Sequence, residues 1–131
     1  MPALECARDM GLTVVLFDGS QACPGRAFAD HFALSDTYDA AGSANKAEKF
    51  CREIMPINAC MCVASDVPHT VAAVGERLGL ATISTATAKL AMDKVLMKDC
   101  FAEHEIPIPY YSEVGSVQDI ERALANIDGP A

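Results

Sequence analysis

The sequence is poor in positive charge and lacks the segments that direct a protein to a membrane. Lysine and arginine number 10 against 18 acidic residues, which gives a net charge of −8. Nucleic acids and anionic lipid surfaces bind clustered lysines and arginines, so this balance argues against both as partners. No apolar run approaches the roughly 20 residues of a membrane span. The N-terminus also lacks the basic start and apolar centre of a signal peptide. We therefore expect a cytoplasmic protein without nucleic-acid or membrane partners.

Several common ligand-binding and catalytic motifs are also absent. The sequence contains no Gly-x-Gly-x-x-Gly loop, no Walker phosphate loop and no Gly-x-Ser-x-Gly elbow. Six cysteines are scattered along it, and neither a Cys-x-x-Cys nor a spaced histidine pair joins Cys60 and Cys62 to complete a zinc tetrahedron. We interpret the cysteines as free thiols in the core of a protein from a reducing compartment, and we predict no metal ligands. A redox or thiol protein remains an alternative.

The apolar pattern predicts an α/β fold. Apolar residues make up 51% of the 131 residues, which is enough for one compact domain. Strands are predicted at 12–17, 32–34, 59–63 and 81–84, and helices at 2–10, 43–55 and 66–78, with Asp66 as the N-cap of the third helix and Gly79 as its end. Residues 85–90 lead into a further helix. Alternating strands and helices imply right-handed crossovers and a mostly parallel, Rossmann-like sheet with helices on both faces.

The stretch from 91 to 109 reads as a helix with an abrupt exit. Asp93 can accept hydrogen bonds from free backbone N–H groups at the helix start. The prolines at 107 and 109 cannot continue the helix, so Tyr110–Val114 is expected to be extended. A capping-box pattern then opens a helix at Ser116 that reaches Ile127. On the first helix one face is shared by Met97, Cys100, Phe101 and His104. On the second helix we expect burial of Val117, Ile120, Leu124 and Ile127.

This arrangement resembles the ATP-grasp ligases. In that family a short helix carrying an Asp-Lys pair is followed by a Gly-Ile-Pro-x-Pro exit, a strand, a helix and a Gly-x-Pro turn. The matching pieces here are Asp93-Lys94, Glu105–Pro109, Tyr110–Val114, Ser116–Ile127 and Asp128–Pro130. Glu105 departs from the pattern, because the family usually has glycine there. The overall pattern looks closest to the group of the carbamoyl-phosphate synthase large chain, biotin carboxylase and the amino-acid ligases.

The resemblance implies an enzyme parent that uses ATP and Mg²⁺ to activate a small carboxylate as an acyl phosphate, which an amine or similar nucleophile then attacks. It implies that Lys94 contacts the ATP phosphates; a solvated surface lysine is the alternative. The Mg²⁺ ligands and the glycine-rich loop of the family would lie beyond Ala131. We therefore expect the fragment to be inactive alone, with no catalytic residue and no tightly bound cofactor.

Three further residues are candidates for substrate binding because they follow predicted strands, at the edge where parallel sheets bind ligands. These are Asp18, Asp66 and His69. Each has a plain structural alternative: a turn residue for Asp18, a helix N-cap for Asp66, and a surface or capping histidine for His69.

The predicted domains are a pre-ATP-grasp α/β domain at 1–90, and a linker helix with the beginning of the ATP-grasp domain at 91–131. The first predicted helix has no strand before it, so we expect this fragment to lack the first strand of the sheet. Such a sheet exposes unpaired edges, and the fragment is expected to be unstable alone or to self-associate. The alternative function is a non-catalytic α/β ligand-binding or docking module.

Overall fold

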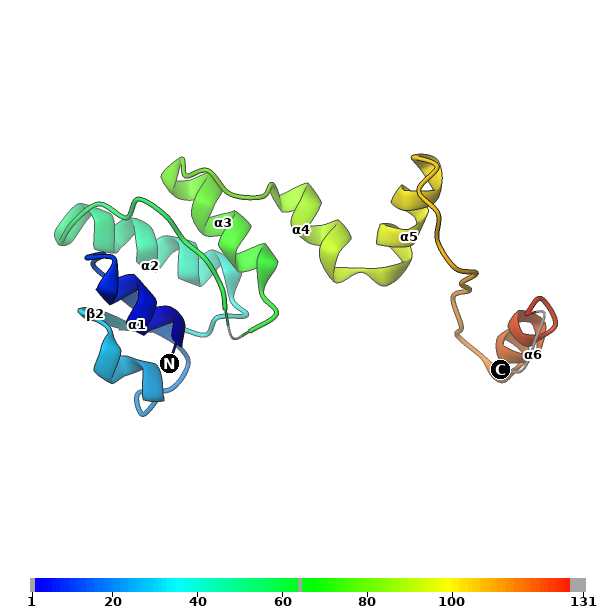
Figure 1. Cartoon of the computed structure of the whole chain (residues 1–131), viewed down its shortest axis with the longest axis horizontal. Helices are drawn as coiled ribbons and strands as arrows, with labels where there is room; N and C mark the ends of the chain where they lie inside the picture. The colour runs from blue at the N-terminus through cyan, green and yellow to red at the C-terminus, as the bar shows by residue number, and fades with distance from the viewer. Residues whose placement is uncertain (1, 64, 128–131) are drawn as a thin grey trace. The chain divides into compact units, whose positions relative to one another are not determined.

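A computed structural model describes residues 2–63 and 65–127. It divides the chain into two compact units, Met1–Lys89 and Leu90–Ala131, and Figure 1 labels the α-helices and β2 along the chain. The first unit holds α1 (Pro2–Asp9), β1 (Val15–Asp18), η1 (Pro24–Phe28), β2 (His31–Leu34), α2 (Ala40–Glu53) and α3 (Pro68–Leu78). Helix α4 (Thr85–Met92) begins in the first unit, and the second unit holds α5 (Lys94–Glu103) and α6 (Val117–Leu124).

The sheet consists of β1 and β2, which pair in parallel with Val15 opposite His31 and Asp18 opposite Leu34. The predicted α/β class with parallel strands is therefore confirmed. The strands predicted at 59–63, 81–84 and 110–114 are wrong, because none of these segments is a strand. A strand requires a hydrogen-bonded neighbour. Among the described residues, no backbone–backbone hydrogen bond outside the helices and strands involves residues 57–63.

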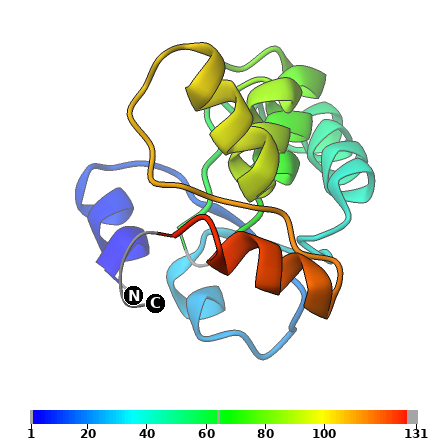
Figure 2. The same ribbon diagram turned by 90° about the vertical axis from the view of Figure 1, so that its right-hand side faces the viewer.

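Helices α2 and α3 lie side by side and carry the core of the first unit (Figures 1 and 2). Ala44 and Ala47 of α2 are buried with Val74 of α3, and Phe17, Ile57 and Cys60 pack against this cluster. The small alanine side chains let the two helices approach closely. Helix α2 ends at Glu53, two residues before its predicted end, so Ile54 is its C-cap residue and is 59% exposed.

Some of the predicted helix ends are confirmed and others are not; α6, for example, ends at Leu124 and not at Ile127. Pro68 occupies the first turn of α3, and Gly79 closes this helix with a φ of 66°, in the left-handed region that glycine adopts without steric cost. Helix α2 begins three residues earlier than predicted, because the Asp39 side chain accepts a hydrogen bond from the N–H of Gly42 and fixes the start there. None of the described helices is long and apolar enough to cross a membrane.

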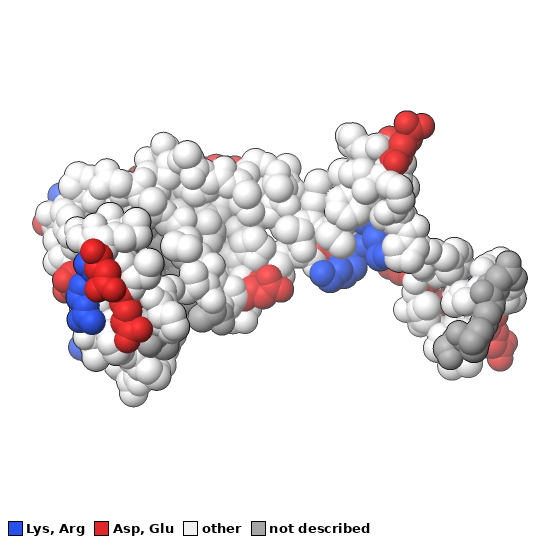
Figure 3. Space-filling view, in the orientation of Figure 1, with Lys and Arg blue, Asp and Glu red and all other residues white. Residues whose placement is uncertain are grey.

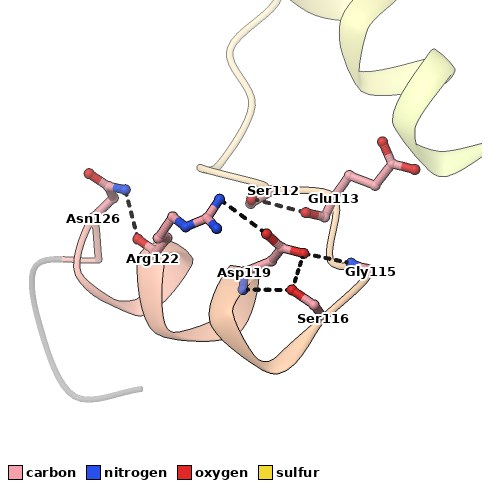
Figure 4. Close-up of polar contacts among 7 residues, drawn as sticks. All are labelled: Ser112, Glu113, Gly115, Ser116, Asp119, Arg122 and Asn126. Atoms are coloured by element: carbon pink, nitrogen blue, oxygen red, sulfur yellow. Dashed lines mark hydrogen bonds and ion pairs between the residues drawn. The ribbon is translucent and has the colours of Figure 1, made fainter.

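In the second unit, α6 starts as its sequence pattern predicts. The Ser116 hydroxyl oxygen accepts a hydrogen bond from the N–H of Asp119 at 3.3 Å, and the Asp119 carboxylate accepts from the Ser116 hydroxyl at 2.6 Å (Figure 4). The predicted burial of its apolar face is wrong, since Val117, Ile120, Leu124 and Ile127 are between 42% and 69% exposed. His104, predicted on one face of α5, is the exposed C-cap residue that follows this helix.

Candidate functional site

Lys94 is the first residue of α5, and the side chain of Asp93 fixes the helix start beside it. The Asp93 carboxylate accepts hydrogen bonds from the N–H groups of Val95 and Leu96, both at 3.0 Å. The predicted N-cap role of Asp93 is therefore confirmed. Both bonds go to the same carboxylate oxygen, Oδ1. The Lys94 side chain is exposed, and its ammonium makes no hydrogen bond or ion pair with another described residue.

One turn further along α5, two side chains hold the segment that follows Pro109. The Tyr111 hydroxyl donates a short hydrogen bond to the Asp99 carboxylate, and the Lys98 ammonium lies 5.2 Å from the centre of the Tyr111 ring. The hydrogen bond to Asp99, with some burial and the Asp99 charge, raises the pKa of Tyr111 above its usual value. Lys94 and Lys98 are four residues apart and so share a side of the helix. On the face drawn in Figure 3, positive side chains gather beside the start of α5.

The sequence analysis missed the contacts of Tyr111 with Lys98 and Asp99. The tyrosine stands two residues after Pro109, and nothing in the local sequence pairs it with a helix twelve residues earlier. The available signal is an aromatic residue soon after a Pro-x-Pro exit, because prolines fix the direction of the chain that leaves the helix.

In the first unit, Asp18 ends β1 and is half-buried. Its carboxylate accepts a hydrogen bond from the N–H of Ser20 at 2.8 Å, which is an Asx-type turn. Its carbonyl oxygen accepts from the N–H of Ser35, the residue that follows β2. Asp18 therefore lies at the carboxyl edge of the strands, as predicted, and one of its carboxylate oxygens is engaged in the turn.

His69 is the second residue of α3, and it contacts the loop between β2 and α2. Its Nε2 lies 3.3 Å from the carbonyl oxygen of Tyr38, and the neighbouring Thr70 hydroxyl donates to the carbonyl of Thr37 at 2.7 Å. Because each contact joins a side chain of α3 to the backbone of the loop, the start of α3 fixes residues 37–38 in place.

Two buried serines hold the same loop from the other side. The hydroxyls of Ser35 and Ser43 lie 3.1 Å apart, and Ser43 also donates to the carbonyl of Asp36 at 3.2 Å. Ser35 and Ser43 are 2% and 1% exposed, so both hydroxyls are shielded from water and depend on these partners. These contacts tie residues 35–38, which we call the rim, to α2 and α3. The side chain of Tyr38 in the rim is 66% exposed.

Asp66 is not the N-cap of α3. That position belongs to Val67, which makes no side-chain cap hydrogen bond, and Pro68 follows at the first helical position. Proline needs no partner for its missing N–H, so the helix start tolerates an apolar cap. Asp66 is exposed one residue outside the helix. Of the three substrate candidates, the structure brings His69 to the loop after β2 and leaves Asp66 exposed before α3.

The six cysteines are free. Cys60 is half-buried, and burial raises the pKa of its thiol. The Cys62 thiol lies 2.7 Å from the carbonyl oxygen of Ser65. The thiols are less buried than predicted: Cys6 is exposed and the other five are half-buried. Within the described part of the chain, no three His, Cys, Asp or Glu side chains converge as a metal-binding group would.

Comparison with known proteins shows that the chain is similar in fold to one solved structure, described below. No family model matches the chain, and no curated protein matches it significantly. The crystal structure of phosphoribosylglycinamide synthetase from Anaerococcus prevotii matches 97% of this chain with a TM-score of 0.70 at 18% sequence identity. The chain spans about a third of that protein, 32% of its length. At this identity the match shows a shared fold.

Proposed function

We propose that this chain is the N-terminal region of an ATP-grasp ligase, with the pre-ATP-grasp α/β domain at 1–90 and the beginning of the ATP-grasp domain at 91–131. The observation that carries the proposal is the match of 97% of the chain to phosphoribosylglycinamide synthetase, which is a ligase of this class. The Asp93-Lys94 helix start and the proline exit, found independently in the sequence, support the same assignment.

The proposed role of Lys94 is to bind the phosphates of ATP. An exposed ammonium at a helix start, with no competing partner among the described residues, can approach a triphosphate and offset its charge. Asp93 supports this role by using its carboxylate in the cap. Its two hydrogen bonds to the N–H groups of Val95 and Leu96 hold the first turn of α5 in place.

The proposed reaction of the whole protein is activation of a carboxylate by ATP to an acyl phosphate, followed by attack of an amine or similar nucleophile. Catalysis of this kind depends on positioning and on charge neutralisation. Mg²⁺ takes oxygen ligands, and the described residues include no converging group of carboxylates that fits it, so we assign no Mg²⁺ ligand to this chain. Within this region we propose His69 and Asp18 as substrate-facing residues of the first unit, with Asp66 as a third candidate.

The test compares Lys94→Ala with Lys98→Ala in the protein encoded by the complete reading frame. Lys98 is the matched control, because it lies one turn away and its ammonium is already held over the Tyr111 ring. By calorimetry, Lys94→Ala is expected to weaken ATP binding by about 10-fold to 100-fold, the range for one lost charged contact. Lys94→Arg should retain most of the affinity, since it keeps the charge, and Lys98→Ala should bind as the unmodified protein does.

Two results would contradict the proposed role. The first is unchanged ATP affinity in Lys94→Ala, and the second is an equal loss in both alanine variants, which would indicate a general effect of surface charge. If the protein binds no nucleotide but binds a small molecule beside His69 and the rim, the function would instead be that of a non-catalytic ligand-binding module.

A further inference from the structure

The contact between His69 and the rim fixes which nitrogen of the imidazole carries the proton. Nε2 of His69 lies 3.3 Å from the carbonyl oxygen of Tyr38. A carbonyl oxygen only accepts hydrogen bonds, so the contact requires the proton on Nε2. In the neutral ring the other nitrogen, Nδ1, then carries a lone pair and accepts hydrogen bonds. Nδ1 has no partner among the described residues, so His69 offers an acceptor to a ligand.

The imidazole of His104, after α5, is expected in the opposite tautomer. Its Nδ1 lies 2.8 Å from the carbonyl oxygen of Cys100, so this contact requires the proton on Nδ1. Each of the two histidines therefore has its tautomer set by one backbone carbonyl. Because the two carbonyls select different nitrogens, His104 is an internal reference for any measurement on His69.

The backbone beside His69 is held by several side chains. The Thr70 hydroxyl donates to the carbonyl of Thr37 at 2.7 Å. The N–H of Tyr38 donates to the Asp36 carboxylate at 2.9 Å, and the carbonyl of the same tyrosine accepts from His69. Ordering a loop on binding costs conformational entropy, and a loop that is already fixed avoids this cost. The imidazole and the rim are therefore preorganised for a ligand.

The charges around the rim favour a cation over an anion. The stretches 18–20, 35–39 and 66–70 contain four aspartates and no lysine or arginine. The Lys46 ammonium, near the end of β2, is already bound to the carbonyl oxygen of Leu34 at 2.7 Å. A carboxylate ligand would be repelled by the aspartates, whereas a protonated amine would be attracted. An amine also donates N–H groups, which the imidazole acceptor requires.

We propose that His69 and the rim bind the amine substrate of the ligase, and that Nδ1 of His69 accepts a hydrogen bond from the amine nitrogen. The Tyr38 ring, on the same rim, provides an aromatic surface that attracts cations. This inference rests on the proposed function, because it assigns one of the two substrates of a carboxylate–amine ligase to this site.

Nitrogen NMR of isotope-labelled histidine rings in the full chain tests the geometry without a ligand. At a pH where the rings are neutral, His69 is expected to carry its proton on Nε2 and His104 on Nδ1. One spectrum records both rings, so the conditions are matched. A His69 ring with its proton mainly on Nδ1 would overturn the proposal, because Nδ1 would then not be an acceptor.

Three probe molecules with the same benzene ring test the class of ligand. Benzylammonium has a positive charge and N–H donors, benzoate has a negative charge, and benzyltrimethylammonium has a positive charge without N–H donors. Benzylammonium is expected to shift the Nδ1 resonance of His69 at about millimolar concentration, and benzoate should leave it unchanged. Benzyltrimethylammonium should bind at least about 10-fold more weakly, the loss for one charged hydrogen bond.

The variant His69→Gln separates the roles of the two ring nitrogens. The glutamine amide N–H can still donate to the carbonyl of Tyr38, but the side chain has no acceptor at the position of Nδ1. Followed at the Tyr38 amide, this variant should bind benzylammonium at least about 10-fold more weakly than the unmodified chain. His104→Gln is the matched control and should bind as the unmodified chain does.

Three results with the probes would overturn the proposal: no binding of benzylammonium, an equal shift with benzoate, or unchanged affinity in His69→Gln. These measurements use the chain without ATP. Their failure is therefore distinct from a failure of the complete protein to bind ATP, which would contradict the proposed function itself.

Discussion

Glu105 adopts the left-handed backbone region, with a φ of 55°, and its N–H donates to the carbonyl of Ala102 at 3.1 Å. The next N–H, of Ile106, donates to the carbonyl of Phe101 at 2.9 Å, so the two bonds form a Schellman motif at the end of α5. This position normally takes glycine, because a side chain costs free energy there. The ATP-grasp pattern has glycine at the same place. Glu105, the residue that departs from the pattern, therefore occupies a position whose backbone conformation favours glycine.

Replacing Glu105 with glycine is expected to stabilise the second unit by about 1 kcal/mol, the usual cost of a side chain in the left-handed region. Thermal unfolding followed by circular dichroism measures the change. The matched reverse experiment is Gly79→Ala at the end of α3, where φ is 66° and no atom lies near the added methyl group. That variant should lose a similar amount, and a gain in stability there would contradict the backbone explanation.

Gly75 allows the chain after α3 to pass close to the helix. A methyl group at this position would lie 2.0 Å from Oγ1 and 2.8 Å from Cβ of Thr82. Gly75→Ala should therefore destabilise the first unit by about 1–3 kcal/mol, as expected for overpacking. Denaturant unfolding measures the loss. Adding Thr82→Gly removes the opposing side chain and should recover much of it; a double variant no more stable than Gly75→Ala would show that the contact is not the cause.

Asp93→Ala removes the cap of α5 and is expected to cost about 1 kcal/mol. Asp93→Asn should retain most of the stability, because its amide oxygen can accept the same hydrogen bonds from Val95 and Leu96. Amide exchange in the first turn of α5 reports the effect locally. If exchange in this turn is as slow in Asp93→Ala as in the unmodified chain, the cap contributes little.

The start of α6 is expected to depend on pH. The Ser116 hydroxyl and the N–H of Gly115 donate to the Asp119 carboxylate and lower its pKa below the usual value, outweighing the opposing effect of desolvation (Figure 4). A lowered pKa in the folded state stabilises the charged form. The stabilisation is therefore complete above the unfolded pKa of about 4 and is lost as the pH falls through the lower folded pKa.

An NMR titration of the α6 amides between neutral and strongly acidic pH tests this dependence. The unmodified chain should lose the cap below about pH 4, and Asp119→Asn should show no such transition. A carboxyl group of Asp119 that titrates at its ordinary value or above would contradict the prediction.

Local signals in the sequence predicted most of the helices and their ends. Gly79, Asp93 and Ser116 act through backbone groups within a few residues, and the structure has each in its predicted role. Strands depend on partners far along the chain. The segment 59–63 has the composition of a buried strand, but it has no hydrogen-bonded neighbour among the described residues, so composition alone misled the prediction.

The candidate site was predicted only where it depends on local sequence. Asp93 could be assigned because an N-cap is a local feature. The contacts of Tyr111 with Lys98 and Asp99, and of His69 with Tyr38, join segments 12 to 31 residues apart, which no local pattern encodes. The spacing of apolar residues in α6 correctly predicted a helix. Such spacing shows which side chains share a face, but it does not show whether another part of the protein covers that face.

The most direct test of the central claim is to sequence the reading frame of the gene on both sides of these 131 residues. An N-terminal ATP-grasp region predicts an apolar strand encoded before Met1, and a Val-Lys-Pro strand with a glycine-rich loop encoded directly after Ala131. A stop codon directly after Ala131 would contradict the account and leave a stand-alone α/β module.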